Sequence, residues 1–150
     1  MLNSILPLMA SGSWTSGTAL VRLATTCEAD TPEAIATAIT QLVHAFHAAN
    51  DCGPSDVQCA LFTATHDLRS AKPAIAARDA GWSSALMLCL AEMPTDTDLP
   101  RCIRALLSVT RGEGATALLP IYLNGTEVLR PDLFGGAKDR AVPRPSSPRT

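Results

Sequence analysis

Two charged residues interrupt apolar stretches of the sequence. Glu92 directly follows the apolar run at residues 85–91, and Arg104 lies inside the run at residues 102–107. Both runs have the length of a buried strand. Burying an unpaired carboxylate or guanidinium group in such a strand costs several kcal/mol. Glu92 and Arg104 must therefore face water, pair with each other, or hold a ligand.

Two further polar side chains fall at other predicted strands, and a third follows the Val128–Leu129 pair. They are Arg22, Tyr122, which is the one tyrosine of the chain, and Arg130. Each of them alone is more often an exposed or ion-paired structural residue than a catalytic one. Several arginines that converge with a single carboxylate suit an anion with more than one carboxylate or phosphate, because guanidinium groups bind these groups bidentately. Since no glycine-rich loop precedes a helix, the pattern favours carboxylates over nucleotides.

The cysteines and histidines predict neither metal nor covalent chemistry. The five cysteines include no C-x-x-C pair, so we expect free, mostly buried thiols in a reducing compartment. His44 and His47 are one helical turn apart without a third ligand on that face, and we expect both to face solvent. The sequence also lacks a recognisable Ser/His/Asp set, a helpful Cys/His pair and a metal-ligand cluster. Covalent, metal-assisted and hydride chemistry therefore have no visible apparatus.

Composition indicates one domain that binds neither nucleic acid nor a membrane. A chain of 150 residues that is 47% hydrophobic can bury one core. From Lys138 onward it has four basic residues and one acid, so the preceding body has eight basic and thirteen acidic residues, which is unlike a nucleic-acid binder. No apolar run is long enough to span a bilayer, and the N-terminus lacks the features of a signal peptide. We expect a soluble, cytoplasmic protein.

Hydrophobic periodicity predicts a mixed α/β, or α+β, fold in which a five-stranded mixed sheet packs against a long helix and shorter helices. The long helix begins at Thr31–Pro32, where threonine can cap it, and stops before Gly53–Pro54. A second helix covers residues 73–78, and Asn124–Gly125 marks a tight turn before residues 126–129. The expected strands are 21–25, 57–65, 84–90, 103–109 and 118–123. Residues 1–20 are expected to form a flexible extension, 21–133 the domain and 134–150 a mobile tail.

Six phrases resemble one known family in its own order. They are residues 21–26, 63–68, 73–78, 89–93, 102–104 and 121–133, the last closing with Leu129-Arg130-Pro131-Asp132-Leu133. A single phrase of this kind would be weak, but six in register are a specific signature. From about Val21 to Leu133 the chain is similar to the AroH-type monofunctional chorismate mutases.

The resemblance implies a homotrimer with a pseudo α/β-barrel arrangement and an active site at each subunit interface. The family reaction is the Claisen rearrangement of chorismate, a dicarboxylate, to prephenate. It needs no cofactor, metal ion or covalent intermediate, which agrees with the absence of such apparatus from the sequence.

Site residues are implied by the same resemblance. Arg104 would donate to the breaking ether oxygen and a carboxylate, and Glu92 would accept from the ring hydroxyl with Cys89 nearby. Arg22 and Tyr122 would hold the side-chain carboxylate. Glu92 and Arg104 would then serve the ligand and would not need to pair with each other. The residues implied to line or close the pocket are Lys72, Ala74, Arg78, Leu129 and Arg130.

Three departures from the family pattern leave other functions open. Lys72 stands where an aromatic residue is usual, Ile75 where a lysine is usual, and Leu23 where a glycine is usual. Lys72 and Ile75 are one helical turn apart, so the positive charge would have moved by that turn. The alternatives are a relative that acts on another chorismate-like enolpyruvyl ether in secondary metabolism, and a non-catalytic homologue that binds a dicarboxylate or a partner protein.

Overall fold

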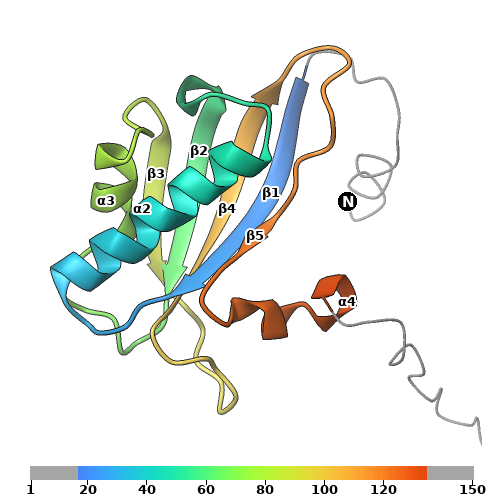
Figure 1. Ribbon diagram of the computed structural model, residues 1–150. Coiled ribbons are helices and arrows are strands. Elements are labelled where there is room, and N and C mark those ends of the chain that lie inside the picture. Colours follow the sequence, from blue (N-terminus) through green and yellow to red (C-terminus); the bar gives the residue numbers. More distant parts are fainter. Residues whose placement is uncertain (1–16, 135–150) are drawn as a thin grey trace, which may run out of the picture.

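The computed structural model describes residues 17–134 (Figure 1). Most of the predicted extension and tail lies outside these residues. Within them, Gly17 to Leu20 belong to the first strand, so this strand starts four residues before the predicted Val21, and Phe134 still belongs to a short helix. In chain order the elements are β1 (Gly17–Thr26), α2 (Pro32–Ala49), the 3-10 helix η1 (Pro54–Asp56), β2 (Val57–Ala64), α3 (Pro73–Asp79), β3 (Leu86–Ala91), β4 (Cys102–Arg111), β5 (Ile121–Tyr122), the 3-10 helix η2 (Thr126–Leu129) and α4 (Pro131–Phe134).

The predicted five-stranded mixed sheet is confirmed. Its strand order is β3-β2-β4-β1-β5. β4 is the centre, antiparallel to both β1 and β2, while β3 and β5 pair in parallel at the two edges. β1 and β4 pair along all ten residues of each strand. Arg22 on β1 and Arg104 on β4 therefore lie on the two strands that the longest ladder of the sheet joins.

Helix α2 follows the predicted signals. The Thr31 side chain accepts a hydrogen bond from the Ala34 N–H at 3.1 Å, and Pro32 occupies the first helical position. The apolar residues of one face are buried against the sheet, and Figure 1 shows α2 crossing the sheet with α3 beside it. These buried residues are Ile35, Ala38, Ile39, Leu42, Val43 and Phe46.

The core under the helices contains a polar pair that the sequence did not predict. Trp82 is fully buried between Phe46 and Phe62, and its indole N–H donates to Nε2 of His47 at 2.8 Å. Nδ1 of His47 lies 2.9 Å from the Cys52 carbonyl oxygen. The prediction that His47 faces solvent is therefore wrong, because burying Trp82 requires an acceptor for its N–H. His44 is exposed, as predicted.

Among the helices of residues 17–134, none covers the other face of the sheet above its lower end in Figure 1. Leucines on this face, from four strands, remain accessible, and we call them the leucine face. Leu88 is 62% exposed and Leu86 is 77% exposed, whereas Ile103 and Leu107 on the helical side are fully buried. The members of the leucine face are Leu20, Leu61, Leu86, Leu88, Leu90 and Leu106.

The C-terminal part departs most from the predicted strands. Instead of a strand over 118–123, only Ile121–Tyr122 pairs with the sheet. The backbone N–H and C=O of Leu119 bond to the Asn50 side chain, at 2.7 and 3.1 Å, and Pro120 has no N–H. The tight turn at Asn124–Gly125 is confirmed, since both residues have positive φ. It leads into η2, where Thr126 donates its hydroxyl to the Leu123 and Ala24 carbonyls.

Two buried polar side chains hold the loops at the far end of the sheet. Asn50 caps α2 by donating to the Phe46 carbonyl at 3.0 Å, in addition to its bonds to Leu119. Arg111, 6% exposed, donates to the Asp51 and Thr116 carbonyl oxygens at 2.9 and 2.7 Å. Backbone groups that would otherwise lack partners are satisfied by these two side chains.

We expect Asn50→Ala to lower the free energy of unfolding by about 1–3 kcal/mol, because it leaves the backbone N–H and C=O of Leu119 without their side-chain partner. Urea unfolding followed by circular dichroism measures this change. Gln41→Ala, on the exposed face of the same helix, should change it by less than about 0.5 kcal/mol. Equal effects of the two substitutions would contradict this assignment for Asn50.

Candidate active site

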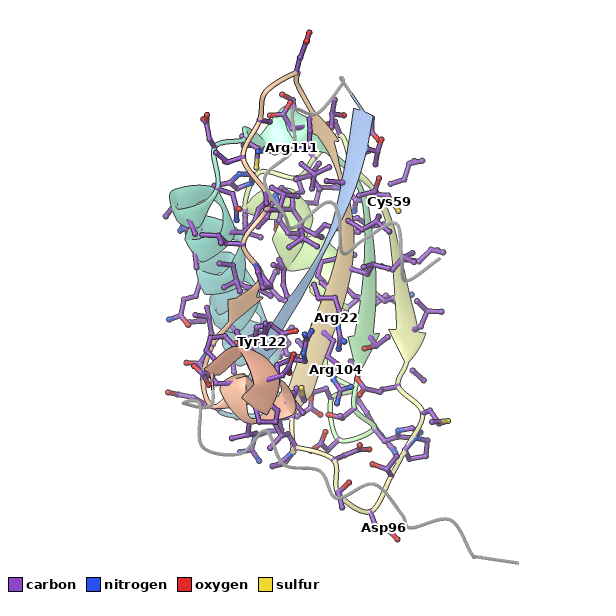
Figure 2. All side chains as sticks on the ribbon, turned by 90° about the vertical axis from the view of Figure 1, so that its right-hand side faces the viewer. Arg22, Cys59, Asp96, Arg104, Arg111 and Tyr122 are labelled. Carbon is purple, nitrogen blue, oxygen red and sulfur yellow. The ribbon has the colours of Figure 1, made fainter. Side chains whose placement is uncertain are left out.

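Three of the predicted site residues, Glu92, Arg104 and Tyr122, lie in one row across the lower end of the sheet, and Arg22 lies in the adjacent row, opposite Leu106. In the register, Thr63 is opposite Arg104, Arg104 is opposite Ala24, and Ala24 is opposite Tyr122. Glu92 follows β3 and extends its pairing, since its N–H bonds to the Ala64 carbonyl at 3.0 Å. Paired residues share a face of the sheet, so these side chains project to the side of the leucine face. Figure 2 shows Arg22, Arg104 and Tyr122 gathered at this end.

Glu92 and Arg104 form an ion pair. Nη2 of Arg104 lies 3.0 Å from Oε1 of Glu92, with 30% and 10% of the side chains exposed, respectively. The expectation that they need not pair is corrected: in a half-buried site, each charge needs the other. Thr63, which the sequence analysis missed, donates its hydroxyl to Oε2 of Glu92 at 2.8 Å. Nε of Arg104 is buried without a hydrogen-bond partner among the described residues.

A cavity of about 590 Å³ lies over this ion pair. Arg22, Glu92, Arg104 and Leu129 all line it, so four of the predicted residues share one space. The guanidinium groups of Arg22 and Arg104 can bind an anionic ligand here, while Glu92 and Asp98 add two carboxylates to the same lining. Apolar walls come from Leu61, Leu90, Met93 and Leu106.

The loop between β3 and β4 closes one side of this cavity and was also missed. Thr95, Thr97 and Asp98 line it. The Asp98 carboxylate accepts from the Thr95 hydroxyl and from the Thr95 N–H at 2.8 Å, and these bonds lower its pKa below the ordinary aspartate value. The sequence does contain a run of cap-forming residues at 94–98, which predicts a loop. Its position over the site depends on the register of the sheet, which the run does not determine.

Tyr122 and Arg130 approach the row from the C-terminal segment. Tyr122 is 6% exposed, and its hydroxyl has no partner among the described residues. Its ring packs edge-on against Phe134 with the centroids 5.5 Å apart. Arg130 is held by both carboxylate oxygens of Asp132, at 2.9 and 2.7 Å, and this pair lowers the pKa of Asp132 and raises that of Arg130.

The remaining predicted residues do not share the first cavity. Lys72 and Cys89 line a second cavity of about 700 Å³ on β3 and the loop before α3, together with His66, Arg69 and Ile75. Cys89 pairs with buried Phe62, and three positions separate it from Glu92, so its side chain points to the opposite face of the sheet. Ala74 and Arg78 lie on α3, and neither lines this second cavity.

Hydrogen bonds to Asp30 fix the loop that presents Lys72. One oxygen of Asp30 accepts from the Arg69 and Ser70 N–H groups, both at 2.9 Å, and from the Ser70 hydroxyl at 2.8 Å. The Ser70 N–H is the first cause of a lowered pKa for Asp30. The basic wall of the second cavity is thus preorganised from the start of α2.

The described part of the chain has neither a cluster of metal ligands nor a membrane-spanning helix. Within residues 17–134, no three His, Cys, Asp or Glu side chains lie close enough together to hold a metal ion. No helix of this part of the chain has the length and apolar character needed to cross a bilayer. All five cysteines are free thiols; Cys27 and Cys102 are buried, and the other three are half-buried.

The fold and the site define an α/β protein in which two guanidinium groups and the Glu92 carboxylate line a cavity on an open sheet face. The family profile for Chorismate mutase type I matches residues 19–133. The chain belongs to this family, as its motifs had indicated.

Named relatives span nearly the same region. The chain is 37% identical over 114 residues to the chorismate mutase AroH of Bacillus subtilis (strain 168), covering 75% of this chain and 90% of that protein. It is 38% identical over 114 residues to the AroH chorismate mutase of Thermus thermophilus, covering 75% and 93%. The structure of a chorismate mutase from Clostridium thermocellum superposes with a TM-score of 0.68 at 33% identity, covering 73% of this chain and 98% of that one.

We expect the Asp132 carboxyl to titrate below the ordinary aspartate pKa, because Arg130 stabilises its ionised form. Its folded pKa is therefore depressed, so the pair stabilises the fold above the unfolded pKa and loses this contribution as the pH falls through the folded pKa. Carbon-13 NMR of the carboxyl group measures the titration. In Arg130→Gln the pKa should rise toward its ordinary value, whereas Arg78→Gln should leave it unchanged. An identical titration in wild type and Arg130→Gln would contradict the ion pair.

Proposed function

We propose that this protein is a chorismate mutase that converts chorismate to prephenate by a Claisen rearrangement. The observation that carries the proposal is the Arg104 guanidinium group, fixed beside Glu92 in a cavity that Arg22 also lines. Family membership and two relatives named as chorismate mutases support the choice of substrate. The named relatives favour chorismate over another enolpyruvyl ether.

Catalysis would be electrostatic. In the rearrangement the ether C–O bond breaks while a C–C bond forms, and negative charge develops at the ether oxygen. Glu92 faces Nη2 of Arg104, and another N–H of the same guanidinium group would donate to that oxygen. Such a preorganised donor accelerates a reaction about a hundred- to a thousandfold.

Glu92 would hold the other end of the substrate. Its carboxylate accepts from Thr63 and Arg104 and has lone pairs left for the ring hydroxyl. Arg22 and Tyr122 would bind the side-chain carboxylate, and Arg130, positioned by Asp132, would approach from the C-terminal side. Holding both ends keeps the enolpyruvyl chain folded over the ring, which supplies the proximity part of the acceleration.

We further propose that the active site is completed between copies of the chain in a homotrimer with a pseudo α/β-barrel arrangement. The second cavity, with Lys72 and Cys89, would face the first cavity of a neighbouring copy. Support comes from the leucine face, because exposed leucines across four strands of one sheet face are typical of a surface that is covered on assembly. The number of three subunits rests on the family resemblance. A cytoplasmic location and a role in aromatic amino acid biosynthesis follow the same resemblance.

Loss of the Arg104 fork should lower kcat for chorismate about a hundred- to a thousandfold in Arg104→Lys and at least as much in Arg104→Ala. Glu92→Gln should lower kcat/KM about ten- to a hundredfold. The decay of chorismate absorbance in the ultraviolet, with prephenate identified as the product, measures both. Glu113→Gln, in an exposed loop, should stay within about twofold of wild type. Absence of prephenate from the wild type, or an unchanged rate in both Arg104 variants, would refute the function.

A charge on the leucine face should dissociate the assembly. Wild-type protein should sediment at three times the 15.7 kDa chain mass, and Leu88→Asp should shift it toward one chain mass, because a carboxylate cannot be buried there unpaired. Leu119→Asp is the matched control, since Leu119 is 56% exposed in a loop outside the leucine face. Wild-type protein that sediments as a monomer would overturn the trimer, and an intact Leu88→Asp trimer would overturn this interface.

A further inference from the structure

A third cavity, of about 460 Å³, lies on the helical side of the sheet, away from the candidate active site. It is bounded by the first half of α2, the end of β1, the residue before β4 and the turn after β5. None of its lining residues lines either of the two cavities described above. Because α2 forms one wall, the cavity does not depend on the leucine face.

Both non-glycine residues with positive φ in the described part of the chain border this cavity. They are Arg101, with φ of 50°, and Asn124, with φ of 56°. Asparagine tolerates this conformation, whereas for arginine it is uncommon. The Arg101 backbone is held by the N–H bond to Asp67, at 2.8 Å, and by the Cys27 N–H, which donates to its carbonyl at 2.9 Å. Backbone held in a rare conformation by several bonds is frequent at ligand sites.

The Arg101 side chain is presented for binding. Its Nε donates to the Cys27 carbonyl at 2.9 Å, which fixes the plane of the guanidinium group. Within residues 17–134, its two terminal nitrogens form no hydrogen bond or ion pair. They are therefore a preset fork for a carboxylate.

An acidic residue shares the cavity with Arg101. Glu28 also lines it, and among the described residues Glu28 forms no ion pair with Arg101 or any other cation. Thr37 and Gln41 add neutral hydrogen-bonding groups, and Ala34 and Ala38 add small apolar surface. The cavity is thus lined by one unpaired positive charge, one unpaired negative charge, and both polar and apolar neutral side chains.

We propose that this cavity binds a free α-amino acid. Its carboxylate would accept from the terminal nitrogens of Arg101, and its ammonium group would donate to Glu28. Phosphate and dicarboxylates fit less well, because Glu28 would repel a second negative charge. A ligand of this size falls within the range of cavities that bind small molecules.

The position of the cavity connects it to the active site. Arg101 is three residues before Arg104, and Asn124 is two residues after Tyr122. The Asn124 side chain donates to the Thr25 hydroxyl at 3.0 Å, and Thr26 donates to the Asn124 carbonyl at 2.8 Å. A ligand that tightens these contacts would act on the ends of the strands that carry the catalytic row.

Isothermal titration calorimetry of the full chain with each proteinogenic amino acid tests the proposal. At least one should bind with a Kd of about 1 mM or tighter. Its N-acetyl derivative and its decarboxylated amine should each bind at least about tenfold more weakly, since each lacks one of the two charges.

Variants separate this cavity from other sites. Arg101→Gly removes the fork while glycine accepts the positive φ without strain, so the fold should be retained. Arg101→Gly and Glu28→Gln should each weaken binding at least about tenfold. Glu33→Gln, on the first turn of α2 outside the cavity, should not weaken it, and neither should Arg104→Lys in the candidate active site. The proposal is overturned if no amino acid binds, if both analogues bind as well as the parent, or if binding survives in both cavity variants.

Discussion

Within residues 17–134, helices cover one face of the sheet and leave most of the opposite face open, and the other features of the molecule follow from this arrangement. α2 and α3 bury Ile103, Leu107 and their neighbours, whereas the opposite face keeps Leu86 and Leu88 accessible. A single chain of this size has no further helix in residues 17–134 to place there. The leucine face is left open for this reason. A second copy of the chain would cover it and would complete the lining of the first and second cavities.

The partly buried charges Glu92, Arg104 and Arg130 at the lower end of that face each have a partner, whereas Arg22 is exposed to water. Thr63 and Arg104 satisfy the Glu92 carboxylate, and Asp132 holds Arg130. The Nε of Arg104 and the hydroxyl of Tyr122 are the exceptions, since both are buried without a partner in the described chain. Buried groups of this kind are costly. Of the two residues, Arg104 lines the first cavity and Tyr122 does not.

The sequence was most informative where structure is locally determined. The cap at Thr31 and the apolar spacing of α2 needed only neighbouring residues. The length of β5 was overestimated because the Leu119 backbone bonds to Asn50, 69 positions away. Hydrophobic periodicity does not reveal contacts between residues so far apart in the sequence. Of the four residues that share the first cavity, Arg22, Glu92 and Arg104 stood out as charges at predicted strands, and Leu129 was identified from the family motif. The placement of Cys89 opposite to Glu92 was already implied by the alternation of side chains along a strand. The role of Thr63 depended on the register between β2 and β3, which one sequence does not reveal.

We propose that Arg104 of one copy and Lys72 of a neighbouring copy serve the same active site. Mixing subunits tests it most directly: Arg104→Ala and Lys72→Glu proteins are each assayed for chorismate turnover, then unfolded together in equal amounts, refolded and assayed again. We predict that each variant alone is strongly impaired and that the mixture recovers about a quarter of wild-type activity, because random assembly joins two intact halves at that fraction of interfaces. A mixture no more active than the mean of the separate proteins, or a fully active Lys72→Glu protein, would contradict the account.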